Sequence, residues 1–354
     1  MAAVVAVAAV IITKAVYGPS ELEEIMRAFL SRVLSSIFSP GWAAASLACL
    51  VILVGGAGHA AKRAQVVHRD FDSPESAVAA LVDTLRKDDH AGLVSILGDE
   101  RLTPRSQKED RADVAAFLKS FDLNHAIDQS KPGVATLSVG EENWFFPVPI
   151  TRQGDFWRFD TQAGMQEIFD RNIGRNELLT IETLKAYVAA QQEYATKSPE
   201  GKVPRQFACR FFSSVGKKNG LYWQAPAGQE ESPIGPMVAK AAREECLAMG
   251  VQPVAFHGYF FKILTRQGKH APGGSYEYMV GGEMVLGFAC MAYPEAYGIT
   301  GVMTFLINQD GTVYQKNLGK RTDFKARAIK EYNPDSTWTK VESVPAASAP
   351  ATTQ

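Results

Sequence analysis

The sequence predicts an α+β protein in which helices and antiparallel sheets occupy separate stretches of the chain. Apolar residues recur at helical spacing directly after residue 73. From 254 to 318, apolar and aromatic runs alternate with clusters of Gly, Pro, Asn and Asp, which is typical of antiparallel strands joined by short turns. The 354 residues are 46% hydrophobic and 21% charged, as in a folded protein with one or two cores.

The first 60 residues have the layout of a secretory signal. From Met26 the chain has a basic start with Arg27 and Arg32, then an apolar run over 42–54 and small residues up to Ala60. This order of basic, apolar and small residues predicts export, with cleavage after Ala60 and a periplasmic or secreted product.

Two alternatives to this signal remain open. Residues 42–60 approach the roughly 20 residues that span a bilayer, so an uncleaved chain would be anchored in the inner membrane. Residues 1–25 precede a more convincing start, so translation begins either at Met1 or at Met26. Residues 61–70 read as a poorly ordered, basic lead-in.

The half from 71 to 175 is predicted to be helical first and then a sheet. Ser73 and Pro74 suit the N-cap and first position of a helix. Two further helices are expected over 90–97, closed by Gly98, and over 110–120, before strands over 134–139, 142–148 and 156–159. Helices followed by a curled antiparallel sheet are NTF2-like in outline, a fold that often encloses a pocket.

The half from 176 to 338 is predicted to open on a long helix and to continue as a second antiparallel sheet. A first helix over 164–173 is expected to end at Gly174, where the chain turns sharply, and the long helix begins at Asn176 or Thr180. A helix over 237–249 carries Lys240, Arg243, Glu244 and Glu245 on a solvated face, the sheet covers 254–318, and a short helix covers 323–330. Residues 339–354 read as a disordered tail rich in Ala, Pro, Thr and Ser.

Several phrases of this sequence carry a resemblance to one bacterial family. They are FWRFDTQAG, IGRNELLTIETLKAYVAAQQEYA, NGLYW with SPIGPM, and the run from Phe256 to Gly319. The chain thereby resembles the family catalogued as domain of unknown function 2950, over roughly 71–338. The resemblance implies export and an α+β architecture and implies no activity. The second half is also similar in outline to the head of a type IV pilin.

Three cysteines follow the predicted signal, and an odd number cannot all pair within the chain. Cys290 lies in an apolar strand and reads as a buried side chain. Cys209 and Cys246 could form a disulfide in an oxidising periplasm.

Arg171, Arg175, Asn176 and Glu177 form the densest polar segment in an otherwise apolar context. In one reading Asn176 and Glu177 cap the long helix, while the arginines pair with Asp160, Asp170 or Glu182 and fasten the two halves. In the other reading the arginines and the helix N-terminus bind an anion. Both readings stay open.

His257 and Ser275 are the weak catalytic candidates. His257 lies in an apolar stretch before Gly258, where it could be a general base for Ser275 or for a nearby carboxylate such as Glu277 or Asp310. Ser275 lacks the G-x-S-x-G context of a nucleophile elbow. Tyr222, Trp223 and His257 could instead contribute to a binding surface, since aromatic residues build partner surfaces.

Composition and motifs favour a binding or structural module of the cell envelope over an enzyme. A net charge of −1 without basic blocks gives no indication of nucleic-acid binding. The sequence has no metal-binding or cofactor-binding motif. Asp310-Gly311 is predicted to be a hairpin turn and not part of a calcium loop. The expected partner is an envelope protein, a glycan or a lipid. A hydrolase using His257, and a carrier of a small apolar ligand in the first half, remain the alternatives.

Overall fold

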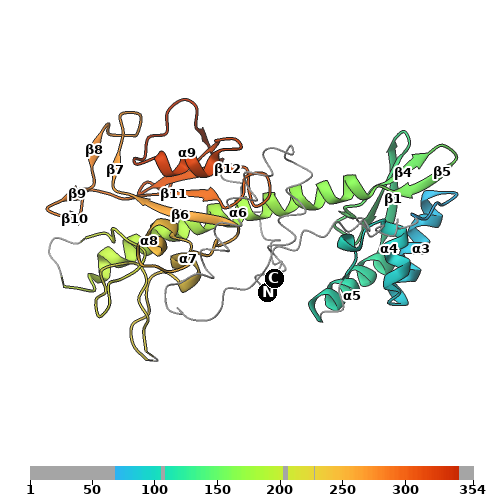
Figure 1. Ribbon diagram of the computed structural model, residues 1–354, viewed down its shortest axis with the longest axis horizontal. Coiled ribbons are helices and arrows are strands. Elements are labelled where there is room, and N and C mark those ends of the chain that lie inside the picture. Colours follow the sequence, from blue (N-terminus) through green and yellow to red (C-terminus); the bar gives the residue numbers. More distant parts are fainter. Residues whose placement is uncertain (1–67, 105–107, 202–205, 227, 343–354) are drawn as a thin grey trace, which may run out of the picture. The chain divides into compact units, whose positions relative to one another are not determined.

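The computed structural model describes residues 68–104, 108–201, 206–226 and 228–342, and Figure 1 shows their helices and strands. The α+β class is confirmed: helices combine with antiparallel sheets around two hydrophobic cores, one within 71–159 and one within 184–332. The predicted signal over 1–60 and most of the lead-in lie outside the described residues.

The first half contains three helices, a short 3-10 helix and a five-stranded antiparallel sheet of order β1-β2-β4-β5, with β3 also paired to β2. Residues Ala135, Leu137 and Val139 alternate along one face of β2 and are buried in the first core. The elements are α3 (Pro74–Arg86), α4 (His90–Leu97), the 3-10 helix (Glu100–Leu102), α5 (Lys108–Leu123), β1 (His125–Lys131), β2 (Val134–Val139), β3 (Trp144–Phe145), β4 (Ile150–Gln153) and β5 (Phe156–Phe159).

Local signals set the helix ends as predicted. Ser73 caps α3 in a reciprocal arrangement with Ser76, and Pro74 occupies the first turn. Gly98 ends α4 in the left-handed region at φ 78°. The end of the lead-in is more ordered than predicted, because the Arg69 N–H donates to Ser95 O and Arg158 pairs with Asp70 at 2.6 Å.

The predicted break at Gly174 is wrong. A single helix, α6 (Thr161–Lys197), runs for 37 residues from the Asp160 N-cap to Ser198 (Figure 1). Gly174 lies inside it, so Asn176 and Glu177 do not cap a helix, and the predicted boundary between 175 and 176 falls in mid-helix. Gly164 brings α6 close to Val148, since a Cβ on this residue would meet the Val148 methyl groups at about 2.7 Å.

The second half is built on a five-stranded antiparallel sheet of order β14-β13-β12-β11-β6. Leu184 and Tyr187 of α6 are buried in its core. The elements are α7 (Pro236–Lys240), α8 (Arg243–Ala248), β6 (Tyr259–Leu264), β7 (Arg266–Gln267), β8 (Tyr276–Glu277), β9 (Met279–Val280), β10 (Glu283–Met284), β11 (Ala289–Pro294), β12 (Met303–Asn308), β13 (Tyr314–Asn317), α9 (Thr322–Ala328) and β14 (Thr339–Lys340).

Two further predictions in this half need correction. The single helix over 237–249 is divided into α7 and α8, and its charged residues do not share a solvated face: Arg243 is buried and pairs with Asp323, and Glu245 accepts the N–H groups of Phe211 and Phe212. The tail begins later than 339, because Thr339 pairs with Gln315 in the sheet; residues 343–354 lie outside the described residues.

Replacing Gly174 with Ala tests the continuity of α6. No side chain or distant backbone lies within 4 Å of a Cβ built there, so Ala should fit and stabilise the helix by about 0.5–1 kcal/mol. The measurement is the free energy of unfolding in urea. A loss of stability would indicate that the chain turns at this residue after all.

Candidate functional site

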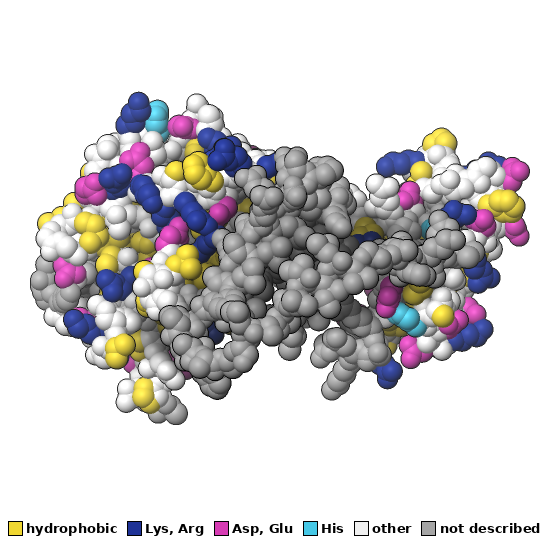
Figure 2. Space-filling view, viewed as in Figure 1, with side chains coloured by type: hydrophobic (Ala, Val, Ile, Leu, Met, Phe, Trp, Pro, Cys, Tyr) yellow, Lys and Arg dark blue, Asp and Glu magenta, His cyan; other side chains and the backbone are white. Residues whose placement is uncertain are grey.

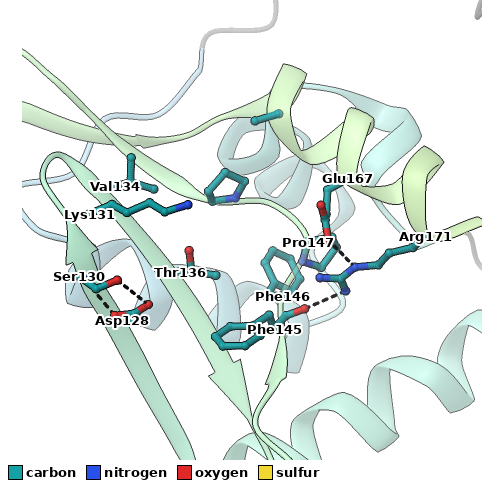
Figure 3. Close-up of a pocket in the computed structure, with 12 residues that line it drawn as sticks. Asp128, Ser130, Lys131, Val134, Thr136, Phe145, Phe146, Pro147, Glu167 and Arg171 are labelled. Atoms are coloured by element: carbon teal, nitrogen blue, oxygen red, sulfur yellow. Dashed lines mark hydrogen bonds and ion pairs between the residues drawn. The ribbon is translucent and has the colours of Figure 1, made fainter. Parts of the chain in front are cut away.

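An open cleft of about 420 Å³ lies on the first sheet, beside the start of α6 (Figure 3). Its volume falls in the range of small-molecule sites. Strands β1, β2 and β3, the segment between β3 and β4 and one face of α6 contribute the lining residues, which are Asp128, Ser130, Lys131, Val134, Thr136, Phe145, Phe146, Pro147, Pro149, Ala163, Glu167 and Arg171.

The alternation of the β1–β2 hairpin places its polar residues in the cleft. Asp128 pairs with Thr136 and Lys131 pairs with Val134, so these four side chains lie on one face of the sheet. The alternate residues, such as Leu137, face the buried core. The face of the sheet away from the first core is therefore the one that is open to a ligand.

One face of α6 forms the second wall. Ala163, Glu167 and Arg171 are spaced by four residues and so lie above one another. Arg171 is held by three contacts: its Nε donates to Glu167 at 2.8 Å, its Nη1 donates to Phe145 O at 2.9 Å, and its guanidinium lies 5.4 Å from the Trp144 ring centroid. The predicted partners Asp160, Asp170 and Glu182 are not the ones that Arg171 uses.

The remaining polar groups are available to a ligand. Lys131 makes no ion pair with any described residue, and its amino group extends over the cleft in Figure 3. Thr136 lies in the middle of the floor, and among the described residues the Asp128 carboxylate accepts hydrogen bonds from the N–H and the hydroxyl of Ser130. No His or Cys is among the described residues that line the cleft. The arrangement offers the Lys131 amino group, the fixed Arg171 guanidinium, hydroxyl groups and apolar side chains, which suits binding.

Asn176 and Glu177 contact the second half instead. Asn176 donates to Thr300 O at 2.9 Å, and one Glu177 oxygen accepts the N–H groups of Val302 and Met303, both at 2.9 Å. Burial, together with the neighbouring Glu177, raises the pKa of Tyr259 far above its usual value. Arg175 is exposed and has no partner among the described residues.

His257 and Ser275 do not meet. His257 lies in a tight turn rather than a strand, with Phe256 N–H and Tyr259 N–H each donating to the other residue's carbonyl, and φ is positive at both His257 and Gly258. His257 precedes the first residue of β6, whereas Ser275 donates to Gln267 O, beyond the last residue of β6. The six residues of β6 span about 20 Å, so this length separates the two side chains.

The carboxylates proposed to assist His257 are also at that far end. Glu277 pairs with Arg266, two residues beyond the last residue of β6. Asp310 follows Asn308, the last residue of β12. Asn308 pairs with Ala289 of β11, and Ala289 pairs on its other side with Leu264, the last residue of β6. Within the described residues, the ring contact of His257 is with Phe256, at 4.0 Å between ring centroids. The predicted histidine–serine or histidine–carboxylate pair is therefore not formed.

The aromatic and cysteine candidates are mainly core residues. Trp223 is buried and donates to Glu230 O, and half-buried Tyr222 stacks edge-on against Phe212. Cys209 and Cys246 are free thiols, so the predicted disulfide is absent. The Cys246 thiol instead lies 3.4 Å from Lys240 O, at the junction of α7 and α8.

The described residues contain neither a metal cluster nor a membrane-spanning helix. No cluster of three or more His, Cys, Asp or Glu side chains in this part of the chain could hold a metal ion. No helix in the same residues is long and apolar enough to cross a membrane.

Comparison with known families matches residues 68–341 to "Protein of unknown function (DUF2950)". The chain belongs to the DUF2950 family. No curated protein and no solved structure matches it, so the NTF2-like and pilin-head-like outlines stay predictions. The match covers both halves of this DUF2950 protein, including the cleft.

Sequence reasoning missed Lys131, Thr136 and Glu167. The β1 strand is a polar edge strand without alternating apolar residues, so its hairpin partner and the open face were not apparent. The Pro132-Gly133 pair before β2 was the available signal, since it marks a tight turn between two strands.

Arg171 and Arg175 form a matched pair for a test of the cleft wall. Arg171→Ala should lower the free energy of unfolding by about 1–2 kcal/mol, because it removes a backbone hydrogen bond, an ion pair and a cation–π contact. Arg175→Ala should change it by less than about 0.5 kcal/mol. Denaturant unfolding measures both, and equal effects would contradict the contacts described.

Proposed function

We propose that this DUF2950 protein is an exported, non-catalytic binding module of the cell envelope, and that the cleft on the first sheet is its binding site. The observation that carries the proposal is the cleft itself: an open sheet face with Lys131, which has no ion pair within the described part of the chain, at one side and a fixed Arg171 at the other. Export is supported by the order of basic, apolar and small residues over 26–60.

The groups in the cleft support binding more than hydrolysis. Ser130 and Thr136 are its hydroxyl groups, and neither has a described His nearby in the lining to act as a base. At the other candidate site, the length of β6 separates His257 from Ser275. Polar side chains aimed at an open face orient a ligand without activating a nucleophile.

The ligand that fits best is an extended segment of an envelope protein. Pro147, Pro149 and Phe146 give an apolar floor for one of its side chains, and aromatic residues such as Phe145 are enriched at protein interfaces. Lys131 would pair with a carboxylate of the segment. A small apolar ligand fits less well, because charged residues line the cleft on both sides.

Export is tested by N-terminal sequencing of the protein from the envelope fraction. The mature chain should begin at Ala61, because the small residues up to Ala60 suit the signal peptidase. A mature chain that still carries residues 42–54 and needs detergent for extraction would favour the anchored alternative.

Site-specific photo-cross-linking in intact cells tests the cleft. A photoreactive phenylalanine analogue at Phe145, which lines the cleft, should capture an envelope protein. The same analogue at Phe156 is the control, since both side chains are about half exposed and Phe156 lies outside the cleft. Adding Lys131→Glu should reduce the Phe145 product several-fold, because it reverses the charge that pairs with the ligand.

Two results of that experiment count against the proposal. Identical products from Phe145 and Phe156 would show that the cleft is not the contact surface. A product at Phe145 that contains a glycan and no protein would overturn the assignment of the ligand class.

A further inference from the structure

A group of cations lies in two adjoining hollows of the second half, of about 560 and 330 Å³. Arg266 and Lys330 line both hollows, so we treat the two as one feature and call it the basic groove. Figure 2 shows Lys and Arg side chains gathered over the region where Figure 1 draws α9 and the neighbouring strands. The cations of the basic groove are Lys262, Arg266, Lys316, Lys325 and Lys330.

The carboxylates in the basic groove do not neutralise these cations. Glu277 and Glu331 line it, and both lie near one residue, Arg266, at 3.6 and 3.7 Å. None of the four lysines forms an ion pair with a carboxylate of the described residues. Five cations against two carboxylates leave the groove with an excess of positive charge.

Neutral partners hold two of the lysines in place. Lys325 donates to Leu318 O at 2.6 Å, and Lys316 donates to the Thr337 hydroxyl at 2.6 Å. Lys316 also lies 5.7 Å from the ring centroid of Trp338, a lining residue. Hydrogen bonds from Thr337 lower the pKa of Asp335 and the charge of Lys316 adds to this shift, so Asp335 partly balances Lys316. The contact of Lys325 is with a neutral carbonyl, so that lysine remains able to attract an anion.

Lys262 is the most constrained of the group. Its half-buried amino group donates to Arg327 O at 3.1 Å and to Ile329 O at 2.8 Å, at the end of α9. An ammonium group has three N–H donors, so these two hydrogen bonds leave one donor for a ligand. Burial lowers its pKa to about 8; Glu244 of α8 opposes this shift, and the adjacent Lys330 amino group adds to it. Two neighbouring lysines in one hollow are stabilised when an anion lies between them.

We propose that the basic groove binds the phosphate group of an anionic ligand. Lysines act as point charges that suit a tetrahedral phosphate, whereas a planar carboxylate prefers the fork of an arginine, and Arg266 already lies beside two carboxylates. A phosphate offers several acceptor oxygens to amino groups that come from β6, β13 and the α9 region. The phosphate belongs either to a lipid headgroup or to a soluble ester.

Two probes applied to the purified, untruncated protein separate these sources. Calorimetry with inorganic pyrophosphate measures binding of a soluble phosphate, and co-sedimentation compares phosphatidylglycerol vesicles with phosphatidylcholine vesicles. Binding to pyrophosphate assigns a soluble ester, and binding to the anionic vesicles alone assigns a lipid headgroup. Binding to neither probe at low ionic strength overturns the proposal.

Matched variants locate the interaction. Lys262→Met and Lys330→Gln should each weaken binding about tenfold, while Lys217→Gln, an exposed lysine outside the groove, should leave it unchanged. Lys330 is exposed, so its variant keeps the fold even if Lys262→Met does not. An equal loss in the Lys217 variant would show nonspecific charge attraction and would overturn the site.

The pH dependence of anion binding tests the role of Lys262 independently. Lys262 is charged below its pKa of about 8 and loses its charge as the pH rises through that value, so binding should weaken between pH 7 and pH 9. Glu244, Lys330, Arg266 and Glu277 are the other charged groups around it. Lys262→Met should remove this decline, and an unchanged pH profile in that variant would contradict the role of Lys262.

Discussion

Glu177 accepts hydrogen bonds at 2.9 Å from the backbone N–H groups of Val302 and Met303, and so ties the middle of α6 to the start of β12. The same helix contributes Ala163, Glu167 and Arg171 to the cleft on the first sheet, and Leu184 and Tyr187 to the second core. Since one uninterrupted helix carries all of these residues, their spacing along its axis is fixed at about 1.5 Å per residue.

This constraint explains why the polar segment around Gly174 remains helical. Residues before it pack on the first half, as Gly164 does against Val148 of the first core, and residues after it are buried in the second core. Helix formation is cooperative, so a stretch between two anchored segments continues the helix more easily than it starts a new one. Arg171, before the glycine, contacts Phe145 of the first half, and Glu177, after it, contacts Val302 and Met303 of the second half.

The sequence predicted elements whose signals are local and missed those that depend on distant residues. The caps of α3 and α4, the buried strand β2 and the Asp310-Gly311 turn between β12 and β13 were recognised, since a few neighbouring residues determine each. Gly174 and Asn176 looked like a stop and a start because tertiary anchoring is not visible in sequence. The basic groove joins residues from 262 to 330, and the cleft joins residues from 128 to 171, so neither forms a motif.

The second half also uses polar side chains where regular pairing of the backbone is missing. Gln191, which is fully buried, bonds both the N–H and the carbonyl of Ala208, and Glu245 accepts the N–H groups of Phe211 and Phe212. Buried backbone groups need such partners, and the side chains supply them for segments outside the sheet.

Lys262 follows the same rule at the end of α9, where helix carbonyls lack intrahelical partners. It differs in one respect: Gln191 and Glu245 use their polar atoms on buried backbone, whereas an ammonium group has three donors and two carbonyls use only two of them. Burial lowers the pKa of this lysine to about 8, because the charged form loses part of its hydration. Lys262 thus stabilises the fold through two backbone carbonyls and, as a lining residue of the basic groove, keeps one donor for a ligand.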